Sequence, residues 1–388
     1  MIFQIPLAWL QLTRVKSRLL VAMAGIAFAD ILMFMQLGFQ AALYESNTQL
    51  HKSLQGDLFL ISPQSQTIAY MESFDRRRLY QARGVNGVDS VSSLYIDFIR
   101  FKNPETRRNR TLLVLGANPD KPIFKFPGIS QNIGQIKLPD VVLIDSASRP
   151  EFGTVAIAEE IEKGESVYTE IGGHRIKVGG LFKLGNSFAA DGNLITSDLT
   201  FLRIFKFKNR NPAQIEVGLI TLKPRVDAQR VKDNLVANLP NDVRVLTKQE
   251  FVDFEQEHWA SSTPIGFIFS LGAMMGFIVG AVIVYQILYT DVSDHLAEYA
   301  TLKAMGYTDF YLLGVVLQEA LILAILGYLP GFALSWGLYG LAQNATLLPI
   351  AMTVFRAYGV LGLTILMCFI GSALAVLKLR TADPADIY

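Results

Sequence analysis

The 388-residue chain contains one cysteine and four histidines, too few for a disulfide framework or a cysteine-based metal site. The cysteine, Cys368, lies in an apolar run, and the histidines lack the spacing of a zinc site. Charged residues make up only 18% of the chain and the formal net charge is +1, which gives no reason to expect nucleic acid as a partner. We therefore predict no metal, no cofactor on this chain and no nucleic acid bound to it.

Motifs of catalysis are also missing from the sequence. The region 45–263 has no G-x-S-x-G elbow, no paired catalytic carboxylates and no glycine-rich phosphate loop. Glu255, Glu257 and His258 lie close together, but on one helix they would spread around its surface, so we interpret them as part of a solvated helix beside a membrane. The sequence predicts that this chain has no catalytic residues and is not itself an enzyme.

Hydrophobic residues make up 51% of the chain and are concentrated in four long runs. A helix needs ~20 mostly apolar residues to cross ~30 Å of hydrocarbon. The runs that satisfy this requirement are 19–44, 265–289, 310–341 and 358–377. The first is too long for the apolar core of a signal peptide and no small-residue cleavage site follows it, so we predict a membrane span. The third is long enough to need a tilt, or a bend at Pro330.

The positions of these runs predict three parts. Residues 1–44 form an interfacial helix and the first span, residues 45–263 a periplasmic α+β domain with two lobes and a stalk, and residues 264–388 the other three spans with a loop and a tail. The predicted fold class is therefore a membrane α-helical protein with four transmembrane helices and a large extracytoplasmic α+β domain between the first and second spans.

The region 45–263 has a mixed pattern of strands and helices. Strands are predicted at 57–61, 92–102, 111–116, 166–171, 175–178, 216–222 and 243–246, and helices at 74–83, 227–239 and 249–259. The pair Gly172-Gly173 between two of these strands indicates a hairpin. Because the last helix leads directly into the second span, we expect it to act as a rigid stalk.

Basic residues flank the first and last spans. They are Arg14, Lys16 and Arg18 on the N-terminal side and Lys378 and Arg380 on the C-terminal side. The positive-inside rule then predicts a multi-pass protein of the inner, cytoplasmic membrane with both termini in the cytoplasm. The loop 291–308 must also be cytoplasmic, because two predicted spans separate it from the N-terminus. Since this loop is acidic, the predicted orientation depends on the basic residues at the two ends of the chain.

The segment before the first span is amphipathic. Ile5, Trp9 and Leu12 fall on one helical face, and Arg14 and Arg18 fall on the other. This pattern fits a short helix lying in the membrane interface, and it equally fits a simple cytoplasmic extension of the first span.

Glycines line one side of the second span. Gly272, Gly276 and Gly280 form a doubled G-x-x-x-G, which lets two helix backbones approach closely in lipid. We interpret this side as a close helix contact between two copies of the chain. The alternative is that glycine is simply frequent in membrane helices.

Three polar residues lie inside the predicted spans. Asp30 is midway through the first span, and Gln318 and Glu319 lie in the third. A charged Asp at the bilayer centre costs ~2.5–3.5 kcal/mol on insertion scales, so these side chains should face protein or water. A proton or substrate relay and a hydrogen-bonded contact between helices both remain open.

The loop between the second and third spans is rich in helix formers and ends at Gly306, a favourable residue for a helix C-terminus. It resembles the coupling loop of the FtsX/MacB-type ABC permeases, which reads approximately E-I-G-I-L-R-A-I-G-A-S. The matching places are filled by Glu298, Leu302, Lys303, Ala304, Gly306 and Thr308, with lysine for the usual arginine.

Three other segments resemble the same family. They are the basic segment 7–19 before the first span, Gln318-Glu319 followed by Gly327 and Gly331 in the third span, and the closing segment 379–386. One span, a large outer domain and three further spans also match the family's topology. The overall pattern is most similar to the DevC permeases of cyanobacterial exporters.

The resemblance implies a mechanism and a set of partners. Two permease chains pair with two ABC ATPase subunits, and Glu298, Leu302, Lys303, Ala304 and Gly306 are the residues that couple each chain to its ATPase. ATP-driven motion passes to the periplasmic domain, which works in efflux with a membrane-fusion adaptor and a TolC-like outer-membrane channel. Because this chain has no G-x-x-x-x-G-K-[ST] motif, ATP and Mg²⁺ are expected on a separate ATPase.

Other functions are compatible with the same topology. An FtsX-like signalling scaffold that controls cell-wall hydrolases typically has an outer domain smaller than 45–263, which favours export. A lipoprotein-releasing permease is the nearer alternative. The exported substrate suggested by the resemblance is a glycolipid or another amphipathic molecule.

Overall fold

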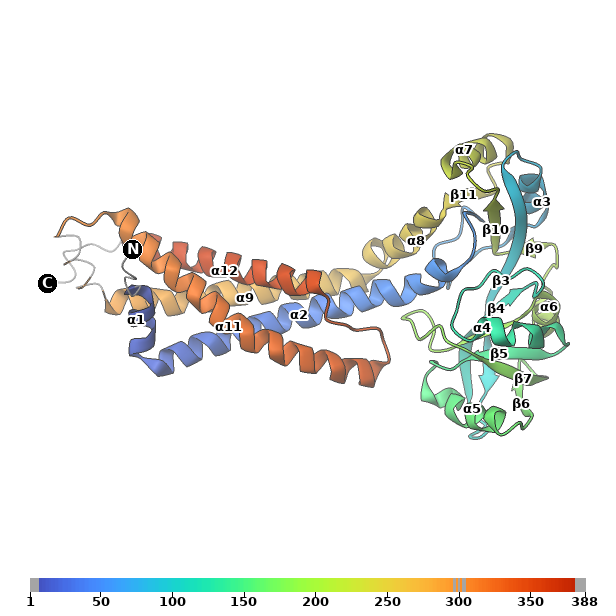
Figure 1. Cartoon of the computed structure of the whole chain (residues 1–388), viewed down its shortest axis with the longest axis horizontal. Helices are drawn as coiled ribbons and strands as arrows, with labels where there is room; N and C mark the ends of the chain where they lie inside the picture. Colours follow the sequence, from blue (N-terminus) through green and yellow to red (C-terminus); the bar gives the residue numbers. More distant parts are fainter. Residues whose placement is uncertain (1–6, 296–297, 299–300, 302–304, 381–388) are drawn as a thin grey trace. The chain divides into compact units, whose positions relative to one another are not determined.

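The computed structural model of the chain describes residues 7–295, 298, 301 and 305–380 (Figure 1). The chain divides into two compact units. The helical unit takes the described residues of 1–42, 264–346 and 350–388, and the sheet unit takes residues 43–263 and 347–349.

Long apolar helices make up the helical unit. They are α2 (Lys16–Ser53), which continues into the sheet unit, α9 (Pro264–Asp294), α11 (Asp309–Thr346) and α12 (Val354–Arg380), preceded by the short α1 (Leu7–Arg14). Each of the four long helices contains a stretch long and apolar enough to cross a membrane. Pro330 lies inside α11, which remains one helix.

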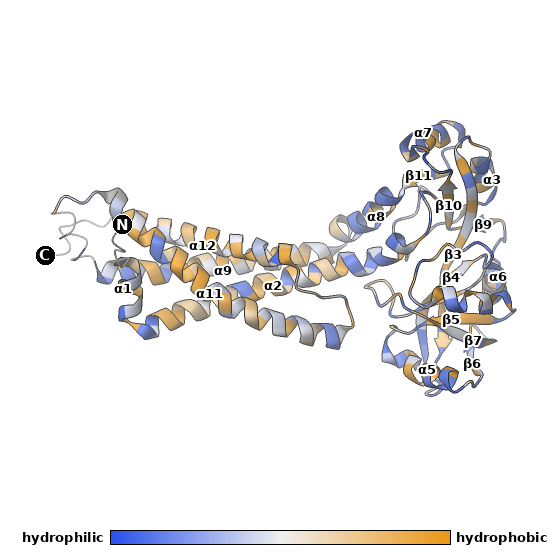
Figure 2. Cartoon of the chain, viewed as in Figure 1, coloured by the Kyte–Doolittle hydropathy of each residue, from blue (hydrophilic) through white to orange (hydrophobic). Residues whose placement is uncertain are grey.

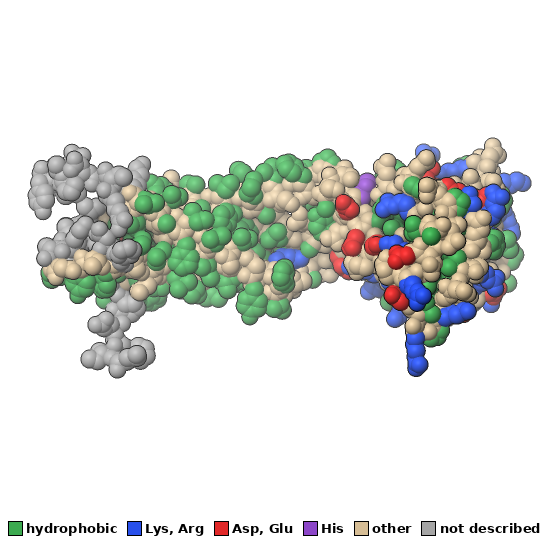
Figure 3. Space-filling view, turned by 90° about the horizontal axis from the view of Figure 1, so that it is seen from above, with side chains coloured by type: hydrophobic (Ala, Val, Ile, Leu, Met, Phe, Trp, Pro, Cys, Tyr) green, Lys and Arg blue, Asp and Glu red, His purple; other side chains and the backbone are tan. Residues whose placement is uncertain are grey.

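Hydrophobic residues predominate in the long helices of the helical unit (Figure 2), and many hydrophobic side chains lie on the face of this unit seen in Figure 3. Phe267 on α9, Trp336 on α11 and Phe355 on α12 are 66%, 63% and 90% exposed. Helices that are apolar on all sides are typical of membrane spans, because lipid replaces water around them.

The sheet unit is an α+β domain. Its strands are β1 (Leu58–Ile61), β2 (Phe74–Asp75), β3 (Val88–Lys102), β4 (Asn109–Ala117), β5 (Val141–Asp145), β6 (Val167–Ile171), β7 (His174–Phe182), β8 (Asn193–Ser197), β9 (Gln214–Ile215), β10 (Val217–Leu222) and β11 (Arg244–Thr247). Its helices are α3 (Arg77–Arg83), α4 (Ile129–Asn132), α5 (Thr154–Glu162), α6 (Asp198–Ile204), α7 (Ala228–Asn238) and α8 (Lys248–Glu257). Together with the four candidate membrane helices, this domain confirms the fold class predicted from the sequence.

Nine of the strands form one sheet in the order β11-β1-β10-β3-β4-β8-β5-β7-β6. β6 also pairs with the end of β3, where Phe101 lies opposite Ile171. This pairing joins six strands into a closed ring, in the order β3-β4-β8-β5-β7-β6. The two lobes expected from the sequence therefore share a continuous sheet, with α3 and α7 near one end of it and α5 near the other (Figure 1).

Both faces of the sheet are covered. Successive residues alternate between two hydrophobic clusters, because side chains of a strand point to opposite faces. Tyr95 belongs to the first cluster, and its neighbours Leu94 and Ile96 belong to the second. The predicted hairpin is formed by β6 and β7, which turn at Gly172 and Gly173, both with positive φ.

One local prediction was wrong in its start and another in its end. The predicted helix 74–83 begins only at Arg77, because Phe74 and Asp75 pair with β9. The predicted helix 249–259 is present as α8, but it does not lead directly into α9, because α8 is followed by a π-helical turn, His258–Ser262, and Thr263 is extended. Pro264 explains the break, since a residue before proline is driven out of the helical region and proline favours the first position of a new helix.

Candidate functional site

The loop that follows α9 lies beside the basic segment at the start of the chain. Arg14 Nη1 donates to Glu298 Oε1 at 3.2 Å, and Arg18 pairs with Asp294. These side chains are about half exposed or more, so each pair contributes only ~0–1 kcal/mol. The pairs place the start of the chain and the predicted coupling loop at the same end of the helical unit.

Gly306 closes this loop. Its φ of +95° lies in the left-handed region that favours glycine. Leu302, Lys303 and Ala304, which the sequence also assigns to ATPase coupling, lie outside the described residues.

Apolar side chains lie near Gly306 at positions that the sequence pattern did not indicate. Met305 is 64% exposed, Tyr307 is 44% exposed and Tyr311 is 45% exposed. The two tyrosine rings lie 4.7 Å apart between centroids. The sequence did contain a signal for them, because large apolar residues stand out in a short polar loop. Exposed apolar groups of this kind often mark contact surfaces.

The three glycines of α9 pack within the chain. A Cβ on Gly272 would lie 2.5 Å from Gln36, and one on Gly280 would lie 2.8 Å from the Cβ of Ala29. Gly276 faces Met33 in the same way. Gly272 and Gly276 therefore make their close contacts with α2, and Gly280 makes its close contacts with both α2 and Met367 of α12.

Asp30 is fully buried between helices. The hydroxyl of Thr364 on α12 lies 2.6 Å from Oδ1 of Asp30 and 2.8 Å from the carbonyl oxygen of Val360. Because a hydroxyl has one proton, it can donate to only one of these acceptors at a time. Gly331 on α11 packs against Asp30, where a Cβ would lie 2.9 Å from that of Asp30. Asp30 therefore lies where α2, α11 and α12 meet.

Gln318 and Glu319 lie on different sides of α11. Gln318 is exposed, whereas Glu319 is fully buried. Among the residues that the structure describes, neither carboxylate oxygen of Glu319 has a hydrogen-bond partner. A helix turns ~100° per residue, so adjacent residues cannot share one face.

The solvated-helix interpretation of residues 255–258 was wrong for Glu255. This side chain is fully buried and accepts hydrogen bonds from Thr67, from Ile68 N–H at 2.8 Å and from Trp259 Nε1–H at 2.8 Å. His51 Nε2 lies 3.4 Å from Oε2 of Glu255. Thr67 and Ile68 come from a loop without periodic pattern, so spacing on the helix could not indicate these two partners.

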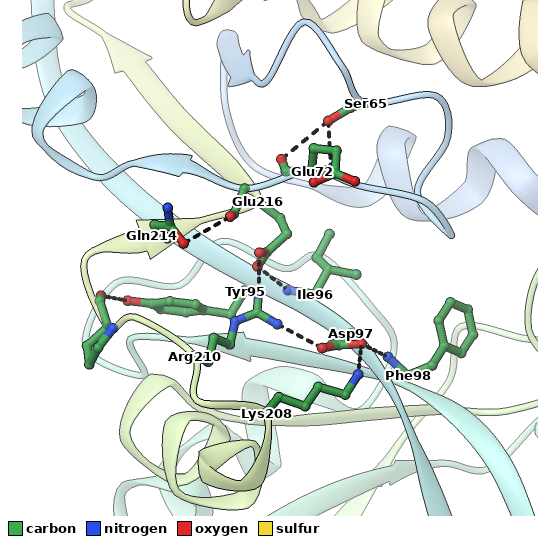
Figure 4. A network of polar contacts seen from close by, with 12 residues as sticks. Ser65, Glu72, Tyr95, Ile96, Asp97, Phe98, Lys208, Arg210, Gln214 and Glu216 are labelled. Atoms are coloured by element: carbon green, nitrogen blue, oxygen red, sulfur yellow. Dashed lines mark hydrogen bonds and ion pairs between the residues drawn. The ribbon is translucent and has the colours of Figure 1, made fainter.

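A second buried carboxylate, Glu216, lies in a polar network of the sheet unit (Figure 4). It pairs with Arg210 and accepts from Ile96 N–H at 2.9 Å, while Arg210 and Lys208 each donate to Asp97 at 2.8 Å. Burial raises the pKa of Glu216 to about 7, although Arg210 and the Ile96 N–H favour its charged form. Because each charge has a partner, we interpret the network as structural.

Comparisons with known proteins give one family and several related structures. Residues 268–384 match the family described as FtsX-like permease C-terminal. No curated protein has a significantly similar sequence. Solved structures that match include the periplasmic region of MacB from Actinobacillus actinomycetemcomitans (9% identity, 51% of this chain, 91% of that chain, TM-score 0.35). They also include the extracellular domain of the noncanonic ABC-type transporter YknZ from Gram-positive bacteria (15% identity, 50% of this chain, 99% of that chain, TM-score 0.30).

Proposed function

We propose that this chain, whose residues 268–384 are an FtsX-like permease C-terminal domain, is the membrane subunit of an ABC-type exporter. The match carries the proposal, because it covers most of α9 and all of α11 and α12. In this proposal a separate ATPase subunit binds ATP and Mg²⁺, and its closure moves the helices of the permease.

The loop between α9 and α11 is the proposed docking element for the ATPase. Glu298, Gly306 and the exposed Met305 and Tyr307 supply a small surface with both charged and apolar groups. Such a surface suits a protein groove, since apolar side chains supply binding energy and charged groups set orientation. Leu302, Lys303 and Ala304 belong to the same proposed element.

We assign this loop and both termini to the cytoplasm. The loop is acidic in sequence, but two of its carboxylates are paired: Arg14 pairs with Glu298, and Arg18 pairs with Asp294. The arginines thereby neutralise part of the loop's charge at their own end of the helical unit. The sheet unit is then periplasmic, and the protein lies in the inner membrane.

The proposed complex contains two copies of this chain. Since Gly272, Gly276 and Gly280 contact α2 and α12 of their own chain, the proposed contact between the two copies uses other exposed apolar faces of the helical unit. A periplasmic membrane-fusion adaptor and a TolC-like channel complete the proposed efflux system. An FtsX-like scaffold for cell-wall hydrolases remains the second candidate, because it shares the family match and differs only in its outer partner.

The proposal is tested by isolating the chain from its native membranes and identifying bound proteins by mass spectrometry. We expect a Walker-motif ATPase together with a periplasmic adaptor. An ATPase recovered with a cell-wall hydrolase would favour the scaffold, and the absence of any ATPase would contradict the proposal.

The docking element is tested by Glu298→Lys. We expect this variant to recover at least about tenfold less ATPase, because it reverses the charge beside Arg14 on the docking surface. Glu257→Lys makes the same charge change at an exposed residue of the sheet unit and should recover the normal amount. Equal recovery by the two variants would remove Glu298 from the interface.

A further inference from the structure

The sheet unit contains a cavity of about 290 Å³ on the face covered by α4. Its walls come from the segment 117–136 and from Gln55. The volume is about twice the ~150 Å³ of an engineered apolar cavity that takes up benzene. It is therefore large enough for the tail of a small amphiphile.

The floor of the cavity is apolar. Phe124, Phe126, Ile129 and Ile136 line it, and all are buried members of the second hydrophobic cluster of the sheet unit. Ile133 packs against this cluster and lines the cavity as well. A ligand that fills this floor gains from burial of apolar surface, about 25 cal/mol per Å².

The rim of the cavity is cationic. The lining includes Lys121 and Lys125, both exposed, and no aspartate or glutamate. Lys121 Nζ donates to the carbonyl oxygen of Val91 at 2.9 Å, which leaves two of its protons for another acceptor. The nearby carboxylate of Asp120 is paired with Lys137 at 2.6 Å.

We propose that this cavity binds a fatty-acid-like amphiphile, with its carboxylate at Lys121 and Lys125 and its apolar tail against Phe124, Ile129 and Ile133. A neutral ligand would gain nothing from the charge of the two lysines, and a cationic amphiphile would be repelled by them. The site is inferred from the sheet unit alone and does not depend on the proposed function.

The wall of the cavity is joined to the end of α2. Gln55 N–H donates to the carbonyl oxygen of Ile123 at 2.7 Å, and Lys125 N–H donates to that of Ser53 at 2.9 Å. Leu54 also forms a bridge with Phe124. Binding in the cavity should therefore slow hydrogen exchange at residues 53–55 as well as in the cavity wall.

The test uses the full-length protein in lipid nanodiscs and a photoreactive diazirine derivative of decanoate. We expect the label in peptides from residues 118–136. Free decanoate should displace it, whereas decanol and decyltrimethylammonium should be at least about tenfold weaker, because they lack the carboxylate that forms charge-assisted hydrogen bonds. Labelling spread evenly over the chain, or equal displacement by decanol, would overturn the proposal.

Two variants and one control sharpen the test. Lys125→Glu should reduce labelling about tenfold, and Ile133→Trp should abolish it by filling the cavity. Lys163→Glu makes the same charge change at an exposed residue outside the cavity and should label normally. Hydrogen exchange of β4 shows whether each variant is folded. If Ile133→Trp does not fold, Lys125→Glu and the competition series still test the proposal. Normal labelling of folded Lys125→Glu would contradict the proposed position of the carboxylate.

Discussion

Among single residues, Glu255 shows how one buried carboxylate can hold several segments together. Three donors reach it, from Thr67, Ile68 and Trp259. Glutamine in its place would turn an amide N–H₂ toward at least one of these donors. We expect Glu255→Gln to destabilise the sheet unit by about 2–4 kcal/mol, since a buried donor would lose its charged acceptor.

Hydrogen exchange of residues 62–70 measures this effect. Glu257→Gln is the matched control, because Glu257 is exposed on the same helix and its replacement should change the free energy of unfolding by less than about 0.5 kcal/mol. Equal exchange in the two variants would show that the buried bonds contribute little.

Glu216 predicts a pH dependence of the sheet unit. Its pKa rises from the usual 4.5 to about 7 in the folded protein, mainly through burial. An acid with a raised folded pKa binds more protons folded than unfolded, so its contribution to stability falls as pH rises through this window. The free energy of unfolding should fall by up to about 3 kcal/mol between pH 4.5 and pH 7 and change little above it.

This change is measured by the opening free energy of amides in β3 and β10, after correction for the pH dependence of chemical exchange. In Glu216→Gln the dependence over the same window should be largely absent. A dependence of equal size in that variant would assign it to another group.

Residue environments were the hardest feature to predict from the sequence. The apolar runs placed Asp30 and Glu319 inside membrane spans, because length and hydropathy are local properties. They did not distinguish the buried Glu319 from the exposed Gln318, since that depends on which neighbouring helix covers each side of α11. The loop partners of Glu255 have no periodic pattern that would have indicated them.

Among the elements, α9 packs closely against its neighbouring helices because its contact positions are glycines. A Cβ on Gly280 would meet the Cβ of Ala29 at 2.8 Å and would come closer still to Met367 Sδ. Alanine there must push α9 from its neighbours, and we expect Gly280→Ala to cost about 1–3 kcal/mol. Thermal unfolding in detergent measures this cost. Gly337→Ala is the control, because nothing lies within 4 Å of the position that its new methyl group would take.

The result also bears on oligomerisation. Because the contact is within one chain, the loss of stability in Gly280→Ala should not depend on protein concentration. A loss that disappears on dilution would instead indicate that the glycines also meet a second copy.

Elements with strong local signals were predicted well, and their pairing was not. The hairpin of β6 and β7 follows from Gly172-Gly173, and β10, α7 and β11 follow from local strand and helix patterns. β1 inserts between β10 and β11, a pairing between segments more than 150 residues apart that no local pattern encodes. The break at Thr263 was missed although Pro264 was its visible cause.

For the whole molecule, two of the four places where the chain passes between the units, at Ala42 and at Thr263, differ in their backbone. α2 is one hydrogen-bonded helix across the division at Ala42, whereas Thr263 is extended at the other division. If motion passes to the sheet unit through α2, a Gly-Gly insertion after Ala42 should abolish it, because glycine destabilises a helix interior by ~1 kcal/mol per residue and the insertion shifts the register. The same insertion after Thr263 should be tolerated.

The measurement uses the chain reconstituted with its ATPase. ATP should alter hydrogen exchange in the sheet unit of the native chain and of the Thr263 insertion, and not in the Ala42 insertion. An unchanged response in the Ala42 insertion would show that α2 does not carry the motion.

The pairing of β6 with β3 has a consequence for how other proteins can recognise the sheet unit. Strand addition requires an open edge, and long open edges also promote aggregation. Within the described part of the chain, β11 is the strand of the large sheet with a whole side unpaired, and it has only four residues. A partner that added a strand there would gain few main-chain hydrogen bonds. Recognition at this edge must therefore depend on side chains and surface shape rather than on an added strand.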